Sequence, residues 1–506
     1  MRVTSVAVVA CVAIAALAVL ARSAIDHPPI YDELLHVLAA RGIVETGSPS
    51  VADGSYSRAL VYSRAVALAF EIRGDNLISA RLPALIAGLL LVAVVSGWIT
   101  LRAGPVPGVV TGIILAISPI TVQMSVFARF YTFHALAIAV AVITAFEATA
   151  PTRAATSRLL LAGLSIAAVI AAWQLQEITL IAVLGLVVGC ALTFWMARRD
   201  AGEQLRHSRL IGPFVAILFA IAVFGWFFTQ STSRFLVASL WAADHAVEPQ
   251  YYLIRGADQL PLLWPLAPAL AILTLTRWKR LGAYVAALFA VCLLAQSIAA
   301  QKSMRYLFYA WPFLCAVLGC GIAAAASSGL NFMRRQRWTS GLSGPTAFAV
   351  LAAITILMSQ EGQRTLKWLS GDLQPFDSRA YETDWSDAVQ SLAFAIGSHQ
   401  VLVTSNSMKA LYYIGDYDYE FNPSVVPETR SGEEFGTDYR TGRPVIGTVE
   451  SLARVTQDGE RVLVLVERRK IVSDFFARTG IVGWLNNNCP ELQTVATGPL
   501  RAWSCD

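Results

Sequence analysis

The sequence predicts a polytopic α-helical membrane protein of about eleven spans, followed by a small C-terminal α/β domain. The first observation is composition: apolar types make up 56% of the 506 residues and charged types 14%, against roughly 45–50% and 25% in soluble domains. A soluble enzyme with a mean hydropathy of +0.56 would have no way to bury its apolar surface. The second is charge, because residues 360–506 hold 20 of the 34 acidic residues and 14 of the 39 basic ones. We therefore divide the chain into a basic membrane domain, residues 1–359, and an acidic tail, residues 360–506.

Eleven apolar segments are candidates for membrane spans, each of which needs about 20 mostly apolar residues. The fifth, eighth and last are short, and the fifth and sixth lie in one near-continuous apolar stretch that could form a single span. The segments are 3–22, 79–100, 106–123, 131–149, 158–173, 177–197, 210–229, 260–276, 281–299, 306–326 and 344–359.

Lysine and arginine indicate the orientation, because short cytoplasmic loops are enriched in them. With the N-terminus inside, the inner segments hold 14 of the 25 basic residues of the membrane domain, and the excess recurs at every inner loop. We expect a multi-pass protein of the cytoplasmic (inner) membrane with an extracytoplasmic, periplasmic tail. Residues 1–23 could instead be a cleaved signal peptide, although signal cores usually run only about 7–15 residues. The basic excess fits topology, since the sequence holds no nucleic-acid-binding motif.

The outer parts carry their own predicted structure. The first outer loop, residues 23–78, contains two amphipathic stretches, near 31–46 and 55–73, which we expect to lie along the membrane surface. The tail alternates signals for strands and helices, which indicates an α/β domain. Strands are predicted at 401–405, 443–448 and 461–467, and helices at 407–414, 449–456 and from 471 onward.

Cys489 and Cys505 are the only cysteines of the tail. Disulfides persist in oxidising compartments outside the cytoplasm. With the tail outside, we expect these two cysteines to pair.

The first outer loop places acids directly after the first span, in the run from Asp26 to Glu33. Helix capping is one interpretation, since acids stabilise a helix N-terminus by about 0.3–1 kcal/mol; catalysis is the other. Asp32 and Glu33 point about 100° apart on a helix, so they cannot both face one substrate atom. Asp32 and His36 share a helix face, but two ligands do not make a metal site. We assign no metal and leave a divalent ion open.

Two groups of cations lie at the outer ends of later spans. Arg129 and Tyr131 precede the fourth, and Lys302 and Arg305 precede the tenth. Snorkelling and interfacial anchoring are the alternatives to a binding role. Cations on the outer side oppose the positive-inside bias, and an anion there, such as a lipid phosphate, would explain them.

These motifs, in this order and on one side of the membrane, resemble the membrane-embedded glycosyltransferases of the C-type fold (GT-C). Specifically, they resemble the family of protein O-mannosyltransferases and lipid A aminoarabinose transferases. The resemblance covers nearly the whole chain. It rests on Tyr31-Asp32-Glu33, Ala80-Arg81-Leu82-Pro83, Ala128-Arg129-Phe130-Tyr131, Arg305-Tyr306-Leu307 with Pro312, Asp384-Trp385-Ser386-Asp387-Ala388, Val401-Leu402-Val403-Thr404 and Tyr412-Tyr413-Ile414-Gly415.

The resemblance implies an inverting transfer of a sugar from a polyprenyl-phosphate donor to an acceptor at the outer face of the membrane. It implies Asp32 as general base, with Glu33 as a helper or second candidate. Lys302 and Arg305 are then expected to hold the donor phosphate, with Arg129 and Tyr131 lining the donor pocket, and no cofactor is assigned.

The acceptor stays open between a glycan, a lipid and a protein. The first loop has Pro28-Pro29 before its acids in place of the Lys-Pro-Pro-type element of the aminoarabinose transferases, and the tail lacks the β-trefoil repeats of the eukaryotic mannosyltransferases. The alternative function is a transporter or flippase of lipid-linked sugar, which would carry ionisable residues near the bilayer midplane. A receptor-like binding protein would explain the tail but not Asp32 or Lys302.

Overall fold

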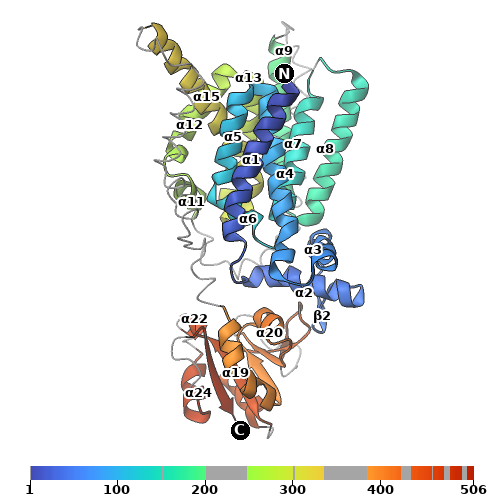
Figure 1. The fold of residues 1–506 in the computed structure, drawn as a ribbon, viewed down its shortest axis with the longest axis vertical. Helices are drawn as coiled ribbons and strands as arrows, with labels where there is room; N and C mark the ends of the chain where they lie inside the picture. The colour runs from blue at the N-terminus through green and yellow to red at the C-terminus, as the bar shows by residue number, and fades with distance from the viewer. Residues whose placement is uncertain are drawn as a thin grey trace. The chain divides into compact units, whose positions relative to one another are not determined.

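The computed structural model describes nine stretches of the chain, which form two compact units (Figure 1). Unit 1 comprises Met1–Ile25 and Ala84–Leu373, and unit 2 comprises Asp26–Pro83 and Gln374–Asp506. The described residues are 2–150, 152–200, 248–299, 302–335, 384–422, 435–457, 460–471, 479–492 and 498–505.

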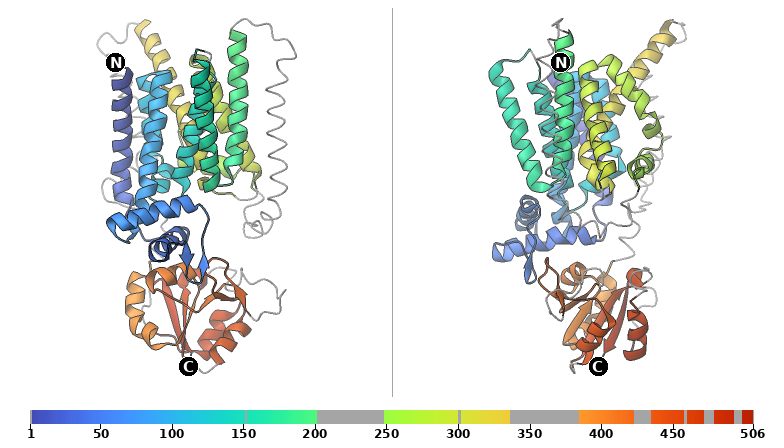
Figure 2. Two further views of the ribbon diagram at one scale, coloured as in Figure 1. Left: turned by 90° about the vertical axis from the view of Figure 1, so that its right-hand side faces the viewer. Right: turned by 180° about the vertical axis from the view of Figure 1, so that it is seen from behind.

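Unit 1 is a bundle of apolar helices that run side by side (Figures 1 and 2). Small residues allow close approach between them: a Cβ added at Gly319 would lie 2.3 Å from the hydroxyl of Thr111 on a neighbouring helix. The described helices are α1 (Arg2–Ala24), α4 (Leu77–Ala103), which begins in unit 2, α5 (Pro105–Ile117), α6 (Pro119–Ser125), α7 (Tyr131–Ala148), α8 (Ala155–Leu175), α9 (Thr179–Asp200), α11 (Tyr251–Gln259), α12 (Leu263–Arg277), α13 (Lys279–Ile298), α14 (Met304–Leu307), the 3-10 turn η3 (Phe308–Ala310) and α15 (Trp311–Arg335).

Seven helices among the described residues are long and apolar enough to cross a membrane, or up to nine spans if each of two bent pairs counts as one. The pairs are α5 with α6, bent by 64°, and α11 with α12, bent by 95°. The apolar stretch that could have formed one span is split into α8 and α9. The predicted spans 210–229 and 344–359 lie outside the described residues, so the total of about eleven stays a prediction.

The first outer loop forms two helices joined by a short antiparallel hairpin. These are α2 (Tyr31–Thr46), β1 (Ser50–Val51), β2 (Gly54–Ser55) and α3 (Leu60–Arg73). Both helices coincide with the predicted amphipathic stretches. The exposed face of α3 carries Val61, Leu68 and Ile72, which suits the predicted position along a membrane surface; that position itself stays a prediction.

The tail is an α/β domain around a six-stranded sheet of order β5-β6-β4-β3-β7-β8. The four central strands are parallel, and the two edge strands are antiparallel to their neighbours. The strand order reverses at β3, because β4 and β6 lie on one side of it and β7 on the other. The elements are β3 (Val401–Thr404), β4 (Tyr419–Phe421), β5 (Gly436–Thr437), β6 (Pro444–Ile446), β7 (Val462–Glu467), β8 (Leu500–Cys505), α19 (Ser386–Ser398), α20 (Ser407–Tyr413), α21 (Val449–Gln457), α22 (Arg468–Ile471) and α24 (Ile481–Asn488).

Helices cover both faces of this sheet (Figure 2). Alternate residues of β7 face opposite sides: Leu463 and Leu465 pack with Leu392 of α19, whereas Val462, Val464 and Val466 join a cluster with residues of α21 and α24. The disulfide between Cys489 and Cys505 is present, which confirms the predicted pairing.

The first outer loop belongs with the tail by its contacts. Leu34, Leu35 and Leu38 of α2 share one buried apolar cluster with Met408 and Leu411 of α20. The division therefore differs from the predicted boundary near residue 360, because residues 26–83 pack with the tail instead of completing the helical bundle.

Candidate active site

The first turn of α2 is fixed by a fully buried ion pair. Arg81 donates from Nε to Glu33 Oε1 at 2.9 Å and from Nη2 to Oε2 at 2.8 Å, and neither side chain is exposed. The same carboxylate accepts the backbone N–H of Ile30 at 3.1 Å, which is half of a capping box. Glu33 therefore caps the N-terminus of α2, which is one of the two interpretations that the sequence left open for the acids of this segment.

His27 completes this cluster. Arg81 Nη1 donates to the carbonyl oxygen of His27 at 2.7 Å, and its Nη2 lies 2.9 Å from Nδ1 of the ring. Burial lowers the pKa of His27; the Arg81 charge lowers it further, while Glu33 opposes both. The lowered pKa favours the neutral imidazole, whose Nδ1 either accepts from the guanidinium or donates to the carbonyl oxygen of Pro28, 2.8 Å away.

Asp32 lies beside this cluster but in a different environment. Its side chain is partly exposed, whereas that of Glu33 is buried. This difference follows from the angle between adjacent positions on a helix. Asp32 is thus the acid of this turn that solvent can reach.

His36 does not extend the site toward a metal. It is buried, its Nδ1 lies 2.9 Å from the hydroxyl of Ser63, and its ring packs edge-on against Tyr56 and Tyr62. Among the residues that the structure describes, no group of three or more His, Cys, Asp and Glu side chains could hold a metal ion.

Arg129, the cation that precedes the fourth predicted span, lies within unit 1. Arg129 is only 4% exposed, and its guanidinium carbon lies 5.3 Å from the ring centroid of Phe130 and 5.8 Å from that of Tyr131. Burial among aromatic rings is not the extended arrangement of a snorkelling side chain. This position argues against simple anchoring at the membrane surface.

The segment that contains Lys302 and Arg305 is hydrogen-bonded to a buried tyrosine. The hydroxyl of Tyr252 donates to the carbonyl oxygen of Ser303 and accepts from its N–H, both at 3.2 Å. Lys302 is 8% exposed and donates to the carbonyl oxygen of Ala299 at 2.8 Å. Burial lowers the pKa of Lys302, and the carboxylate of Glu248 opposes this. Arg305 is partly exposed, 5.4 Å from the ring centroid of Tyr306.

The helices that follow Arg129 and Arg305 in sequence are in contact within unit 1. The ring of His134, in α7, packs edge-on against that of Tyr309, with centroids 5.4 Å apart, and its Nε2 lies 2.9 Å from the hydroxyl of Thr179. Trp311 Nε1 donates to the hydroxyl of Ser118 at 2.8 Å and so ties the start of α15 to α6. Residues about 170 positions apart in sequence, His134 and Tyr309, are therefore neighbours.

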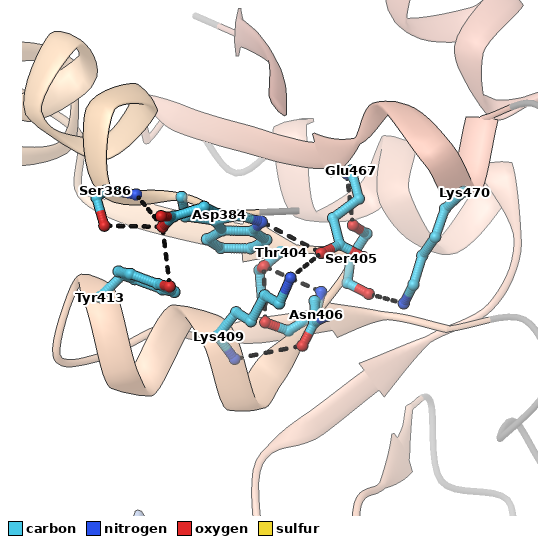
Figure 3. A network of polar contacts seen from close by, with 10 residues as sticks. Asp384, Ser386, Thr404, Ser405, Asn406, Lys409, Tyr413, Glu467 and Lys470 are labelled. Atoms are coloured by element: carbon cyan, nitrogen blue, oxygen red, sulfur yellow. Dashed lines mark hydrogen bonds and ion pairs between the residues drawn. The ribbon is translucent and has the colours of Figure 1, made fainter. Parts of the chain in front are cut away.

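A second polar network lies at the carboxyl ends of β3 and β7 in the tail (Figure 3). Lys409 Nζ lies 3.1 Å from Glu467 Oε1, to which Trp385 Nε1 also donates, and Lys470 donates to the carbonyl oxygen of Ser405. Burial raises the pKa of Glu467, but Lys409 and Lys470 outweigh it and lower that pKa. Open α/β sheets bind ligands where the strand order reverses. Here these polar groups bond one another, so the network stabilises the tail.

The fold of this chain is similar to that of several solved structures, although no family model and no curated protein matches its sequence. The crystal structure of ArnT from Cupriavidus metallidurans bound to undecaprenyl phosphate matches 100% of this chain and 98% of its own length, with a TM-score of 0.63 and 14% identity; its apo state gives 0.59. The archaeal oligosaccharyltransferase AglB from Archaeoglobus fulgidus, in complex with an inhibitory peptide and a dolichol-phosphate, matches 100% of this chain and 74% of its own, at 0.57 and 10% identity. The chain has the fold of ArnT and AglB. This confirms the C-type fold that the sequence motifs indicate.

Two residues of the Glu33–Arg81–His27 cluster, Arg81 and His27, had no role in the sequence interpretation. Arg81 stood in a quoted motif, and His27 stood beside the acids, but neither was assigned a contact. The signal for Arg81 was present, because an arginine near the start of an apolar span requires a buried partner. Its partner, 48 positions earlier, could not be inferred from spacing.

Proposed function

We propose that the protein is an inverting glycosyltransferase that moves a sugar from a polyprenyl-phosphate-linked donor to an acceptor at the outer face of the cytoplasmic membrane. The observation that carries this proposal is the fold, shared over the whole chain with ArnT bound to undecaprenyl phosphate and with AglB bound to a dolichol-phosphate. The acceptor is a glycan, a lipid or a protein.

In the proposed reaction the acceptor oxygen or nitrogen attacks the anomeric carbon from the face opposite the phosphate. A new bond to that carbon forms, and the bond from the sugar to the phosphate oxygen breaks, with its electron pair leaving on the phosphate. Asp32 takes the acceptor's proton as general base, since it is the partly exposed acid of its turn. Phosphate is a good leaving group, so no general acid is assigned.

The cations carry the other half of the chemistry. Lys302 and Arg305 hold the phosphate and neutralise its growing charge, and Arg129 with Tyr131 lines the donor pocket. The bonding of Glu33 to Arg81 supports the helper role for Glu33 over that of a second base. We assign no metal to this reaction.

The sidedness of the proposal comes from charge. The lysine and arginine excess of the inner loops supports an N-terminus inside and a tail outside. A sugar donor on that side must already have been carried across the membrane on a lipid, which suits a polyprenyl phosphate.

The test is transfer of radiolabelled sugars from polyprenyl phosphates to a membrane extract by the purified protein. Asp32→Asn should lower the transfer rate about 10²–10⁴-fold and leave donor binding nearly normal, because it removes the base but not the cations. Asp26→Asn, at an exposed acid of the same segment, is the matched control and should transfer normally. Near-normal transfer by folded Asp32→Asn would contradict the base assignment. Movement of the donor across vesicles without transfer would favour the flippase instead.

A further inference from the structure

The tail domain contacts the residue that precedes Asp32. Tyr31 opens α2, and the guanidinium carbon of Arg440 lies 5.5 Å from the centroid of its ring. Arg440 belongs to the turn between β5 and β6 of the tail. A cation at this distance from an aromatic ring is attracted to its face. The same guanidinium carbon lies 5.4 Å from the ring centroid of Tyr439, so Arg440 contacts one ring of the tail and the first residue of α2.

The turn that carries Arg440 is itself held by several bonds. Asp438, which is fully buried, accepts at Oδ1 from the backbone N–H of Arg440 at 3.0 Å and from its Nε at 2.9 Å. Gly442, in the left-handed region at φ +71°, donates its N–H to the carbonyl oxygen of Asp438 at 2.7 Å. Tyr417 donates to the hydroxyl of Thr441 at 2.7 Å. The guanidinium is therefore presented to Tyr31 from a fixed position.

The same turn also contacts the hairpin of the first outer loop. A Cβ at Gly54 would lie 2.5 Å from the carbonyl oxygen of Arg440, so only glycine fits this approach. Beside it, Arg443 forms an ion pair with Asp53 at 2.7 Å and another with Asp416 at 3.1 Å. Arg443 thus belongs to the same interface, and none of the contacts described for it reaches Tyr31.

The environment of Tyr31 agrees with a docked side chain. Burial, and after it the nearby carboxylate of Glu420, raises the pKa of Tyr31, although Arg440 opposes them. The phenol therefore stays neutral. Tyr31 is partly buried and packs against the apolar cluster that Leu34 and Leu35 of α2 form with Met408 of the tail.

The first turn of a helix frays readily, because its leading N–H groups have no partners within the helix. In α2, Arg81 holds this turn at Glu33, and Arg440 contacts it at Tyr31. Asp32 lies in that turn, where fraying would change the direction of its carboxylate. We propose that Tyr31 and Arg440 are positioning residues, through which the tail domain fixes the first turn of α2 and so the orientation of Asp32. This inference rests on the proposed function, in which Asp32 is the general base.

The test compares Arg440→Met with Arg443→Met in the full-length protein, using kcat and KM for a radiolabelled polyprenyl-phosphate sugar. Arg440→Met should lower kcat per folded molecule about tenfold or more, because small errors in the placement of a catalytic group are costly, and leave KM within about twofold. Arg440→Met also removes the ion pair with buried Asp438, so Tyr31→Leu, which keeps that pair, should give a similar loss of kcat. Arg443→Met should leave kcat unchanged, and Arg440→Lys, which keeps the charge over the ring, should recover most of the loss. In the double variant Asp32→Asn with Arg440→Met, the second change should add almost nothing, since residues that act as a unit are not additive.

Hydrogen–deuterium exchange of residues 30–35 separates this inference from the proposed function. Arg440→Met should speed exchange there and Arg443→Met should not. Unchanged exchange in Arg440→Met overturns the docking contact, whatever the activity. Unchanged kcat, or a loss that adds in full to that of Asp32→Asn, overturns the positioning role while the base assignment stands. If the wild-type protein transfers no sugar, the proposed function fails, and faster exchange in Arg440→Met still supports the contact.

Discussion

Buried charges have different partners in the two units. In the first turn of α2, in unit 2, the buried charge of Glu33 pairs with an opposite charge, whereas the buried charge of Lys302, in unit 1, bonds a neutral group. Glu33 is enclosed and receives two hydrogen bonds from a single guanidinium, that of Arg81, so its charge is matched within the fold. Lys302 is nearly as buried, yet the bond described for it goes to the neutral carbonyl of Ala299, and the carboxylate of Glu248 acts on it through its charge. A carbonyl can be exchanged for a phosphate oxygen without leaving an opposite charge behind, whereas a bidentate carboxylate cannot. The difference suggests which charges hold the fold and which serve a ligand.

Breaking the matched pair is expected to have the largest effect. Arg81→Met leaves the carboxylate of Glu33 buried without its counter-charge, which typically costs 3–5 kcal/mol of about 5–15 kcal/mol of total stability. Thermal unfolding in detergent measures this. Arg41→Met is the matched control, because the Arg41–Asp75 pair is partly exposed and is expected to contribute about 0–1 kcal/mol.

A partial rescue makes the same comparison sharper. Adding Glu33→Gln to Arg81→Met removes the buried charge, so the double variant should be more stable than Arg81→Met alone. If Arg81→Met unfolds no more easily than Arg41→Met, the buried pair is not what fixes this turn.

Removing the disulfide should lower stability without touching either the Glu33–Arg81 pair or Lys302. Replacing Cys489 and Cys505 by alanine opens a loop with a sequence separation of 16, for which the chain-entropy model gives roughly 3 kcal/mol. The transfer rate per folded molecule should not change. In cells the pair should be found oxidised by alkylation and mass spectrometry if the tail is outside the cytoplasm. Two reduced thiols in freshly isolated protein would contradict the proposed sidedness.

Much of the fold could be predicted because it depends on local patterns. Long continuous apolar runs give the helices of unit 1, and short apolar runs rich in valine, leucine and isoleucine give β3, β6 and β7, each close to its predicted range. The strands β4, β5 and β8 were missed. Two of them are very short, and β8 is interrupted by polar residues, so each owes its place to pairing with distant strands.

The candidate site residues could be selected from the sequence by residue type, but their contacts could not. Asp32 stands out because an acid follows an apolar span, and the cations stand out because they oppose a topological bias. The contacts that decide their roles connect distant parts of the sequence: Arg81 reaches back to Glu33, and Arg440 reaches Tyr31. Nothing in the spacing of residues encodes such pairs, because they depend on how finished helices and strands pack.

The smallest expected change in free energy is at Lys302. It tests whether this buried charge serves the donor instead of holding the fold. If Lys302 serves the donor, Lys302→Ala should leave the unfolding temperature nearly unchanged, because it removes a bond to a neutral carbonyl and a costly buried charge together. A hydrogen bond to a charged group contributes about 1.5–3 kcal/mol, so KM for the polyprenyl-phosphate sugar should rise roughly ten- to hundredfold. Turnover should also fall, since the same cation neutralises the departing phosphate.

Arg255→Ala is the control for Lys302→Ala, because Arg255 is an exposed cation of α11 whose guanidinium lies 3.1 Å from the carboxylate of Asp258. It should change neither KM nor stability by more than about twofold or 0.5 kcal/mol. Lys302→Arg keeps the charge but replaces a point charge by a planar fork, so it should recover donor binding in part. Loss of stability in Lys302→Ala with an unchanged KM would place Lys302 with Arg81 among the charges that hold the fold, and the donor phosphate would then need another partner.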